Sequence, residues 1–93
     1  MVTQVLLIEK LESNGRKASF AARCHVGVLR IGDSLPVAVD PAGDRHSVDV
    51  KCVEIRLAAR IIVDELEENF GGLVVLEGAD APSLSSDWTL SSE

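Results

Sequence analysis

The feature that most constrains the fold is a two-residue alternation between positions 17 and 28. Every even-numbered position from 18 to 28 is apolar, whereas Lys17, Ser19, Arg23 and His25 stand between them. Successive side chains of a β-strand point to opposite faces, so this pattern predicts a strand with one face on a core. The turn signal Ser13-Asn14-Gly15 before it predicts a hairpin with the apolar-rich segment 2–12.

A second indication of a curved sheet lies between positions 48 and 57. Apolar residues fall at 48, 50 and 52, and then the phase slips to 53, 55 and 57. One extra residue at Cys52/Val53 would return the side chains to the core, as a β-bulge does where a strand bends around a barrel. Upstream, Leu35, Val37 and Val39 repeat the alternation before a turn at 40–44.

The segment 53–68 is ambiguous, because its apolar residues fit both a strand followed by a turn and an amphipathic helix. Beyond it we expect a buried strand at 73–76, a short last strand around Trp88 and Leu90, and fraying at 91–93. Turn signals recur at intervals of roughly ten residues. The sequence therefore predicts one all-β domain over 1–93, a small closed or partly open antiparallel barrel of about six to seven strands.

Composition limits the classes of function. A formal charge of −6 disfavours wide contact with a phosphate backbone, so no DNA partner is expected and RNA is disfavoured. The N-terminal apolar run is too short for a signal or membrane segment, and two cysteines do not make a secreted disulfide framework. We therefore expect a cytoplasmic protein without a membrane partner.

Two short apolar segments that contain glycines follow each other along the chain. They are "GVLRIGDSL" from Gly27 and "ENFGGLVVLEG" from Glu68, and the tripeptide Val-Glu-Ile at 53–55 lies between them. Together they resemble the β-barrel that follows the G domain in elongation factor Tu and other translational GTPases. The resemblance covers roughly residues 5–90 and favours strand over helix at 53–68. The glycine-rich phosphate cradle of a G domain does not occur in this sequence. The residues expected to form turns or to define these two segments are Gly15, Gly27, Gly32, Asp33, Gly43, Gly72 and Gly78.

The resemblance also suggests binding residues. In elongation factor Tu this barrel helps to hold the aminoacylated end of tRNA, and the matching positions here are Glu54 and Asn69. Arg56 and Arg60 are candidate cations for phosphate. The competing interpretation is that Glu54 and Arg56 are solvent-facing strand residues and that Asn69 forms a turn.

Other candidate sites have simpler interpretations. Cys24, His25, His46 and Cys52 are zinc-ligand types, but alternation sends Cys24 and His25 to opposite faces, so buried free cysteines are expected. An acidic stretch, Asp64, Glu65, Glu67 and Glu68, lacks calcium-loop spacing and is interpreted as a solvated turn. The serines and histidines match no catalytic motif. We expect no metal, no cofactor and no catalytic residue.

Three hypotheses for the function follow. The first is a stand-alone, non-enzymatic module, an adaptor or inhibitor that binds a protein with a basic surface and carries an apolar patch rimmed by carboxylates. The second is an RNA-binding barrel, associated with tRNA or the ribosome, that uses Glu54, Arg56, Arg60 and Asn69. The third is an enzyme of unrecognised type, which requires a pocket with strongly perturbed titratable groups.

Overall fold

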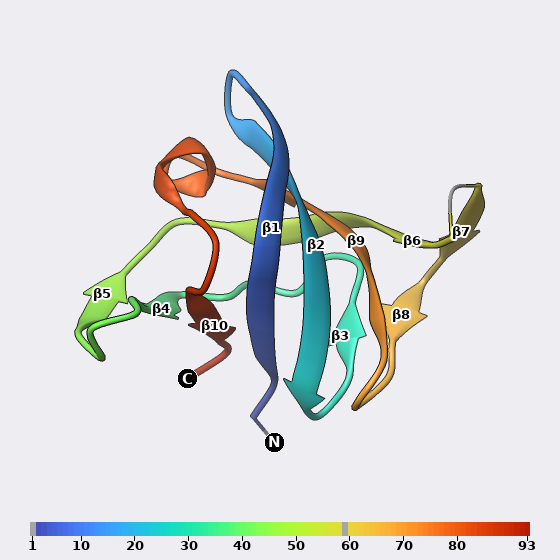
Figure 1. Cartoon of the computed structure of the whole chain (residues 1–93), viewed down its shortest axis with the longest axis horizontal. Helices are drawn as coiled ribbons and strands as arrows, with labels where there is room; N and C mark the ends of the chain where they lie inside the picture. The colour runs from blue at the N-terminus through green and yellow to red at the C-terminus, as the bar shows by residue number, and fades with distance from the viewer. Residues whose placement is uncertain (1, 59) are drawn as a thin grey trace.

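The computed structural model describes residues 2–58 and 60–93. In this part of the chain the strands form an eight-stranded antiparallel sheet in the order β5-β4-β10-β1-β2-β9-β6-β7 and a two-stranded sheet of β3 and β8 (Figure 1). The hairpin of β4 and β5 lies at one side of the molecule, and β7 and β8 lie at the other. The elements are β1 (Gln4–Asn14), β2 (Lys17–Val26), β3 (Leu29–Arg30), β4 (Val37–Val39), β5 (Arg45–Ser47), β6 (Lys51–Leu57), β7 (Ile61–Val63), β8 (Glu65–Leu66), β9 (Gly71–Glu77), the 3-10 helix η1 (Ala81–Ser83) and β10 (Thr89–Ser91).

β2 is the central strand that the alternation predicts. It pairs with β1 on one edge and with β9 on the other. Ala18, Phe20, Ala22 and Cys24 are buried, so the apolar face of the alternation lies on the core. The loop to β1 has two residues and opens with Gly15 at φ +62°, because tight hairpin turns of this kind need a left-handed residue there.

Backbone hydrogen bonds also link the two halves of the sheet across the molecule. The N–H of Gly32 donates to the carbonyl of Cys52 at 2.7 Å, the N–H of Cys52 donates to the carbonyl of Asp33 at 2.9 Å, and Ser34 and Lys51 form an isolated bridge. The segment before β4 therefore lies against the beginning of β6. The continuous ladder ends at β5 and β7, and these bonds curve the sheet toward a barrel.

The core is aliphatic with one aromatic ring, that of Phe20. Leu7, Ile55 and Leu76 are among its largest fully buried side chains, and they come from β1, β6 and β9. Trp88 packs against the edge of this core. Within the described residues, no helix is long or apolar enough to cross a membrane.

The segment 53–68 is strand and turn, and the helix alternative is wrong for its described residues. The ladder between β6 and β9 shifts register between Cys52 and Glu54, which confirms the predicted bulge. β6 continues to Leu57, and β7 returns antiparallel to it with Arg56 opposite Ile62. Residue 59 lies outside the described part.

Three features differ from the sequence expectations. The described chain has ten strands instead of six to seven, because several are only two or three residues long. Residues 91–93 do not fray: Ser91 belongs to β10 and is 5% exposed, and the N–H of Ser92 donates to the carbonyl of Thr3 at 3.0 Å. In β4 the core residue is Ala38, whereas Val37 and Val39 are half-buried on the other face.

Most of the expected turn glycines adopt a left-handed backbone. Gly72 does not, but a Cβ there would lie 2.8 Å from the carbonyl oxygen of Arg56, so close packing of β9 on β6 excludes a side chain. Asp33 accepts a hydrogen bond from the N–H of Arg30 at 2.8 Å and so closes its own turn. Positive φ angles are found at Gly15, Gly27, Gly32, Gly43 and Gly78.

Gly27 and Gly43 give a matched test of this packing, because both have positive φ but only Gly27 is crowded. A Cβ at Gly27 would meet the carbonyl oxygen of Val2 at 2.5 Å, whereas nothing lies within 4 Å at Gly43. We expect Gly43→Ala to lower the free energy of unfolding by about 1 kcal/mol and Gly27→Ala by about 3 kcal/mol or more. Urea denaturation measures both, and equal losses would contradict the close approach of the N-terminal segment to Gly27.

Candidate functional site

Glu54 and Arg56 lie on the outer face of β6 and bind each other. The Nε of Arg56 donates to Oε2 of Glu54 at 2.6 Å, and both side chains are half-exposed. Glu54 stands opposite Val75 of β9, and Arg56 stands opposite Leu73. The structure thus brings these two predicted residues together, as an ion pair that satisfies much of the charge of Arg56.

The other two predicted residues lie elsewhere. Arg60 is exposed in the loop between β6 and β7. Asn69 is exposed in the turn before β9, at φ +71°, and its N–H donates to the carbonyl of Cys24 at 2.7 Å. The backbone of Asn69 therefore forms the turn that the simpler interpretation assigned to it, and the four residues do not converge on one site.

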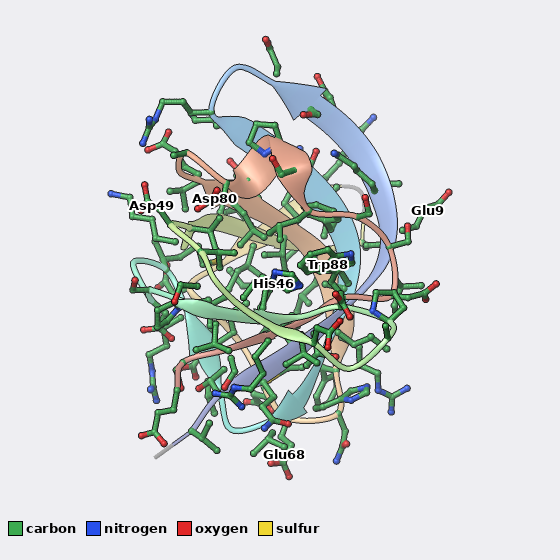
Figure 2. All side chains as sticks on the ribbon, turned by 90° about the vertical axis from the view of Figure 1, so that its left-hand side faces the viewer. Glu9, His46, Asp49, Glu68, Asp80 and Trp88 are labelled. Carbon is green, nitrogen blue, oxygen red and sulfur yellow. The ribbon has the colours of Figure 1, made fainter. Side chains whose placement is uncertain are left out.

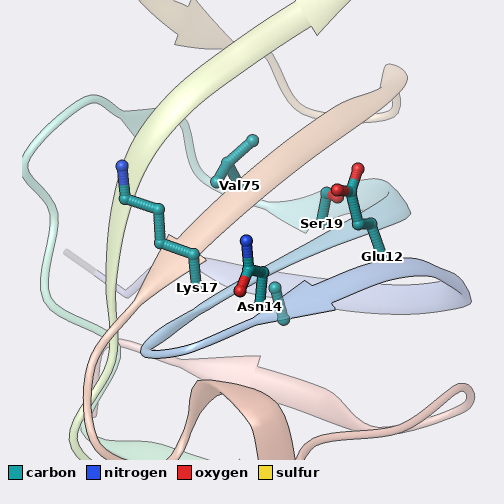
Figure 3. Close-up of a pocket in the computed structure, with 6 residues that line it drawn as sticks. Glu12, Asn14, Lys17, Ser19 and Val75 are labelled. Carbon is teal, nitrogen blue, oxygen red and sulfur yellow. The ribbon is translucent and has the colours of Figure 1, made fainter.

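A shallow hollow of about 220 Å³ lies on the outer face of β1, β2 and β9 (Figure 3). Ser19 and Val75 stand opposite each other across β2 and β9, with Glu12 opposite Ser19 on β1. Lys17, at the rim, pairs with Glu77 at 3.7 Å. The hollow offers hydroxyl, amide and carboxylate groups, and its one lysine already has an anionic neighbour.

A larger groove, of about 540 Å³, lies between the end of β6, β7 and β8, and the turn before β9. We call it the β7–β8 groove. Gly72 lies under it, since a Cβ there would come 3.3 Å from Leu57 and 3.5 Å from Leu66. The groove is lined by Leu57, Val63, Asp64, Glu65, Leu66, Glu67 and Phe70.

Phe70 is the unusual residue of this groove, because the residue is 56% exposed although hydrogen bonds fix its backbone. Its N–H donates to the carbonyl of Glu67 and its carbonyl accepts from the N–H of Cys24, both at 3.0 Å. An exposed aromatic ring on a hydrogen-bonded turn is a preformed contact surface, since little conformational freedom is lost when a partner covers it. Ile61 and Ile62 of the adjoining β7 are also exposed, by 58% and 65%.

The rim of the groove is acidic. Glu65 pairs with Arg30 at 3.2 Å, whereas neither Asp64 nor Glu67 forms an ion pair with any residue the structure describes. Glu68, just outside, accepts a hydrogen bond from the N–H of Gly27 at 3.0 Å. The four carboxylates are exposed to solvent, as predicted, but the stretch is not all turn, because Glu65 belongs to β8 and pairs with β3.

The residues with zinc-ligand character do not form a site. Over residues 2–58 and 60–93, no three His, Cys, Asp or Glu side chains are grouped so that they could hold a metal ion. Cys24 and Cys52 are free and fully buried. Burial raises the pKa of the Cys24 thiol, and it raises the pKa of Cys52 to about 12.

His46 has a separate structural role on the hairpin of β4 and β5. Its ring lies 5.1 Å from that of Trp88, and the two side chains are neighbours in Figure 2. Its Nε2 is 2.8 Å from Oδ2 of Asp40. The hydrogen bond from His46, with further bonds from the backbone N–H groups of Asp44 and Ala42, lowers the pKa of the Asp40 carboxyl. These contacts hold the hairpin turn against Trp88.

The sequence predicts an apolar patch rimmed by carboxylates but does not show where on the fold the patch lies. Ile61, Ile62 and Val63 precede the acidic stretch and Phe70 follows it. The signal that could have located the patch is this uncharged apolar run beside a run of carboxylates. It lies in the segment 53–68, whose apolar spacing fits both a strand followed by a turn and a helix. The exposure of Phe70 depends on the turn geometry, which no local pattern reveals.

Comparison with solved structures identifies the fold. The whole chain superposes on part of translation elongation factor SelB from Methanococcus maripaludis, in the apo form and in complex with the GTP analogue GppNHp, with a TM-score of 0.75 and 18% identity in each case. GDP-bound aIF5B from Aeropyrum pernix matches 97% of the chain with a TM-score of 0.65 and 14% identity. The chain spans 19% of SelB and 14% of aIF5B. No protein-family model and no curated protein sequence matches it.

Burial of the two thiols should slow their reaction with thiol reagents. In the folded protein at pH 8, we expect both Cys24 and Cys52 to react with a thiol reagent at least about a hundredfold more slowly than in the urea-unfolded chain, because the thiolate is the nucleophile and both sulfurs are shielded. Absorbance at the reagent's product wavelength follows the reaction. A thiol that reacts at the unfolded rate would contradict the closed core around β2 and β6.

Proposed function

We propose that this barrel, which has the fold of a translation-factor β-barrel domain, is a non-enzymatic binding module whose β7–β8 groove binds a protein partner with a basic surface. The observation that carries the proposal is the fixed, exposed ring of Phe70 in an apolar groove rimmed by Asp64 and Glu67. Apolar contact surface with complementary charge at its rim is the general anatomy of a protein–protein interface.

The charges favour a protein partner over RNA. Affinity for a phosphate backbone requires cations that are free to displace counterions. Here Lys17, Arg30 and Arg56 each lie beside a carboxylate, at 3.7, 3.2 and 2.6 Å. The carboxylates at the groove repel phosphate and attract lysine or arginine side chains, which supports a basic protein segment as the ligand.

The size of the groove favours a short segment of the partner over a broad flat surface. A volume of about 540 Å³ is within the range that small-molecule and side-chain pockets occupy. It therefore suits one or two large apolar side chains, which would pack on Phe70 and Leu57. Ile61 and Ile62 extend the apolar contact area beyond the groove.

Groove variants test the proposal. With the partner first isolated on the wild-type chain and then purified, we expect Phe70→Ala to weaken binding by about tenfold to a hundredfold and Glu67→Lys to weaken it more at low salt than at high salt. Calorimetry measures the affinities. The matched control is Glu9→Lys, an equal charge change at an exposed residue of β1, which should leave the affinity within about twofold. If Glu9→Lys and Glu67→Lys weaken binding equally, the groove is not the binding site.

The RNA alternative makes the opposite prediction for the arginines. If the chain binds RNA through its outer face, Arg56→Ala and Arg60→Ala should each lower the affinity and flatten its dependence on salt. On our proposal the same variants leave binding of a basic partner unchanged or strengthen it, since each removes a positive charge from the acidic protein. Binding lost on ribonuclease treatment, together with an effect of both arginines, would replace the protein partner with RNA.

A further inference from the structure

β7 is the last strand of the eight-stranded sheet at the side of the β7–β8 groove (Figure 1). One of its edges pairs with β6, and no strand that the structure describes pairs with the other. A strand directs the N–H and C=O groups of alternate residues to its two edges, so part of the β7 backbone faces outward without a ladder partner. Such an edge accepts an additional strand.

The two terminal strands of the sheet differ in how they are protected. β5, at the other end, consists of Arg45, His46 and Ser47, whose polar and charged side chains discourage pairing with another chain. β7 consists of Ile61, Ile62 and Val63 and carries no charge and no proline. Charged residues and prolines are the usual means of blocking an exposed edge, and β7 has neither. This contrast within one sheet singles out β7 as the edge open to a partner.

The free edge is continuous with the groove. Ile61 stands opposite Leu57, and Val63 stands opposite Ile55, so these side chains share the face that the groove occupies. Ile62 stands opposite Arg56 and lies on the outer face. A strand added along β7 would therefore send alternate side chains toward the groove and the remaining ones outward.

The charges beside the free edge of β7 determine which charged side chains an added strand can carry at each end. Arg60 precedes β7, whereas Asp64, Glu65 and Glu67 follow it. A basic side chain is therefore favoured beside the end of β7 that leads to Asp64 and disfavoured beside Arg60. Antiparallel pairing of two β7 edges would set Arg60 of each copy beside Asp64 of the other, so a second copy of this chain is the competing occupant. A stable dimer of the free chain in analytical ultracentrifugation would overturn a separate partner.

From these observations we infer that the partner binds as an extended segment which adds a strand to the free edge of β7, with apolar side chains at alternate positions and lysine or arginine beside Asp64 and Glu67. The inference rests on the proposed function and specifies the partner's conformation. Backbone hydrogen bonds to β7 provide affinity, and the groove selects the side chains, as in other cases of strand addition. A helical segment would leave the outward backbone groups of β7 unpaired.

A displayed library of random peptides of about ten residues, selected against the full chain, tests the inference. We expect selected peptides to carry apolar residues at positions i and i+2 with lysine or arginine nearby. The backbone nitrogens of a selected peptide can be methylated at either of two phases, the odd-numbered or the even-numbered positions. Methylation in one phase should weaken binding by about tenfold or more and in the other phase only slightly, because only one set of N–H groups faces β7.

A protein variant supplies the matching control. Ile62→Ala should weaken binding of the selected peptide by about threefold to tenfold, whereas Ile8→Ala, at an exposed isoleucine of β1, should not. Apolar residues spaced at i, i+3 and i+4, or insensitivity to methylation in both phases, would overturn strand addition and leave the groove as a binding site. A library that yields no peptide sensitive to Phe70→Ala would overturn the proposed function itself.

Discussion

The fold depends on the pairing of β2 along both of its edges. β1 and β9 bind it through nearly its whole length, and its buried face places Phe20 at the centre of the core. Ala18 and Ala22 flank Phe20 on this face, and their small side chains leave room for the layers that pack over them. Because a shift of one residue would turn this face to solvent, the register of β2 determines which side chains of β9, and then of β6, face outward.

The bulge in β6 determines which side chains of this strand face the core and which face the candidate site. It returns Ile55 to the core, and it leaves Glu54 and Arg56 on the outer face, where they form an ion pair with each other. The strand then ends at Leu57, and the chain returns as β7, which is short and has no further strand beside it in the described structure. The groove and the open edge are thus consequences of where β6 bends and stops.

Sequence patterns predicted the elements that rest on strong alternation. The strand at β2, its hairpin with β1 and the bulge near Cys52 were readable because apolar phase alone defines them. The alternation gave a wrong prediction at β4, where Leu35 and Ala38 are both buried although they are three residues apart. The chain pairs with the beginning of β6 before β4 and with β10 within β4, so one two-residue alternation does not continue through the segment. Residues 91–93 were expected to fray because they are the last of the sequence, but Ser91 is fixed by pairing with Gln4.

The candidate site was only partly predictable. Glu54, Arg56, Arg60 and Asn69 came from a resemblance, and the structure joins only the first two. The groove depends on tertiary features, namely the fixed turn at Phe70 and the close approach of β9 to β6 at Gly72, which have no local signature. The fold is that of a translation-factor β-barrel domain.

Site-specific photocrosslinking tests directly whether Phe70 lies in a protein-binding surface. A benzophenone-bearing amino acid would replace Phe70 in one variant and Leu11, a similarly exposed residue of β1, in another. We predict a crosslink to a protein at position 70 that survives ribonuclease and is absent at position 11. A crosslink to RNA at position 70, or the same protein at both positions, would contradict it.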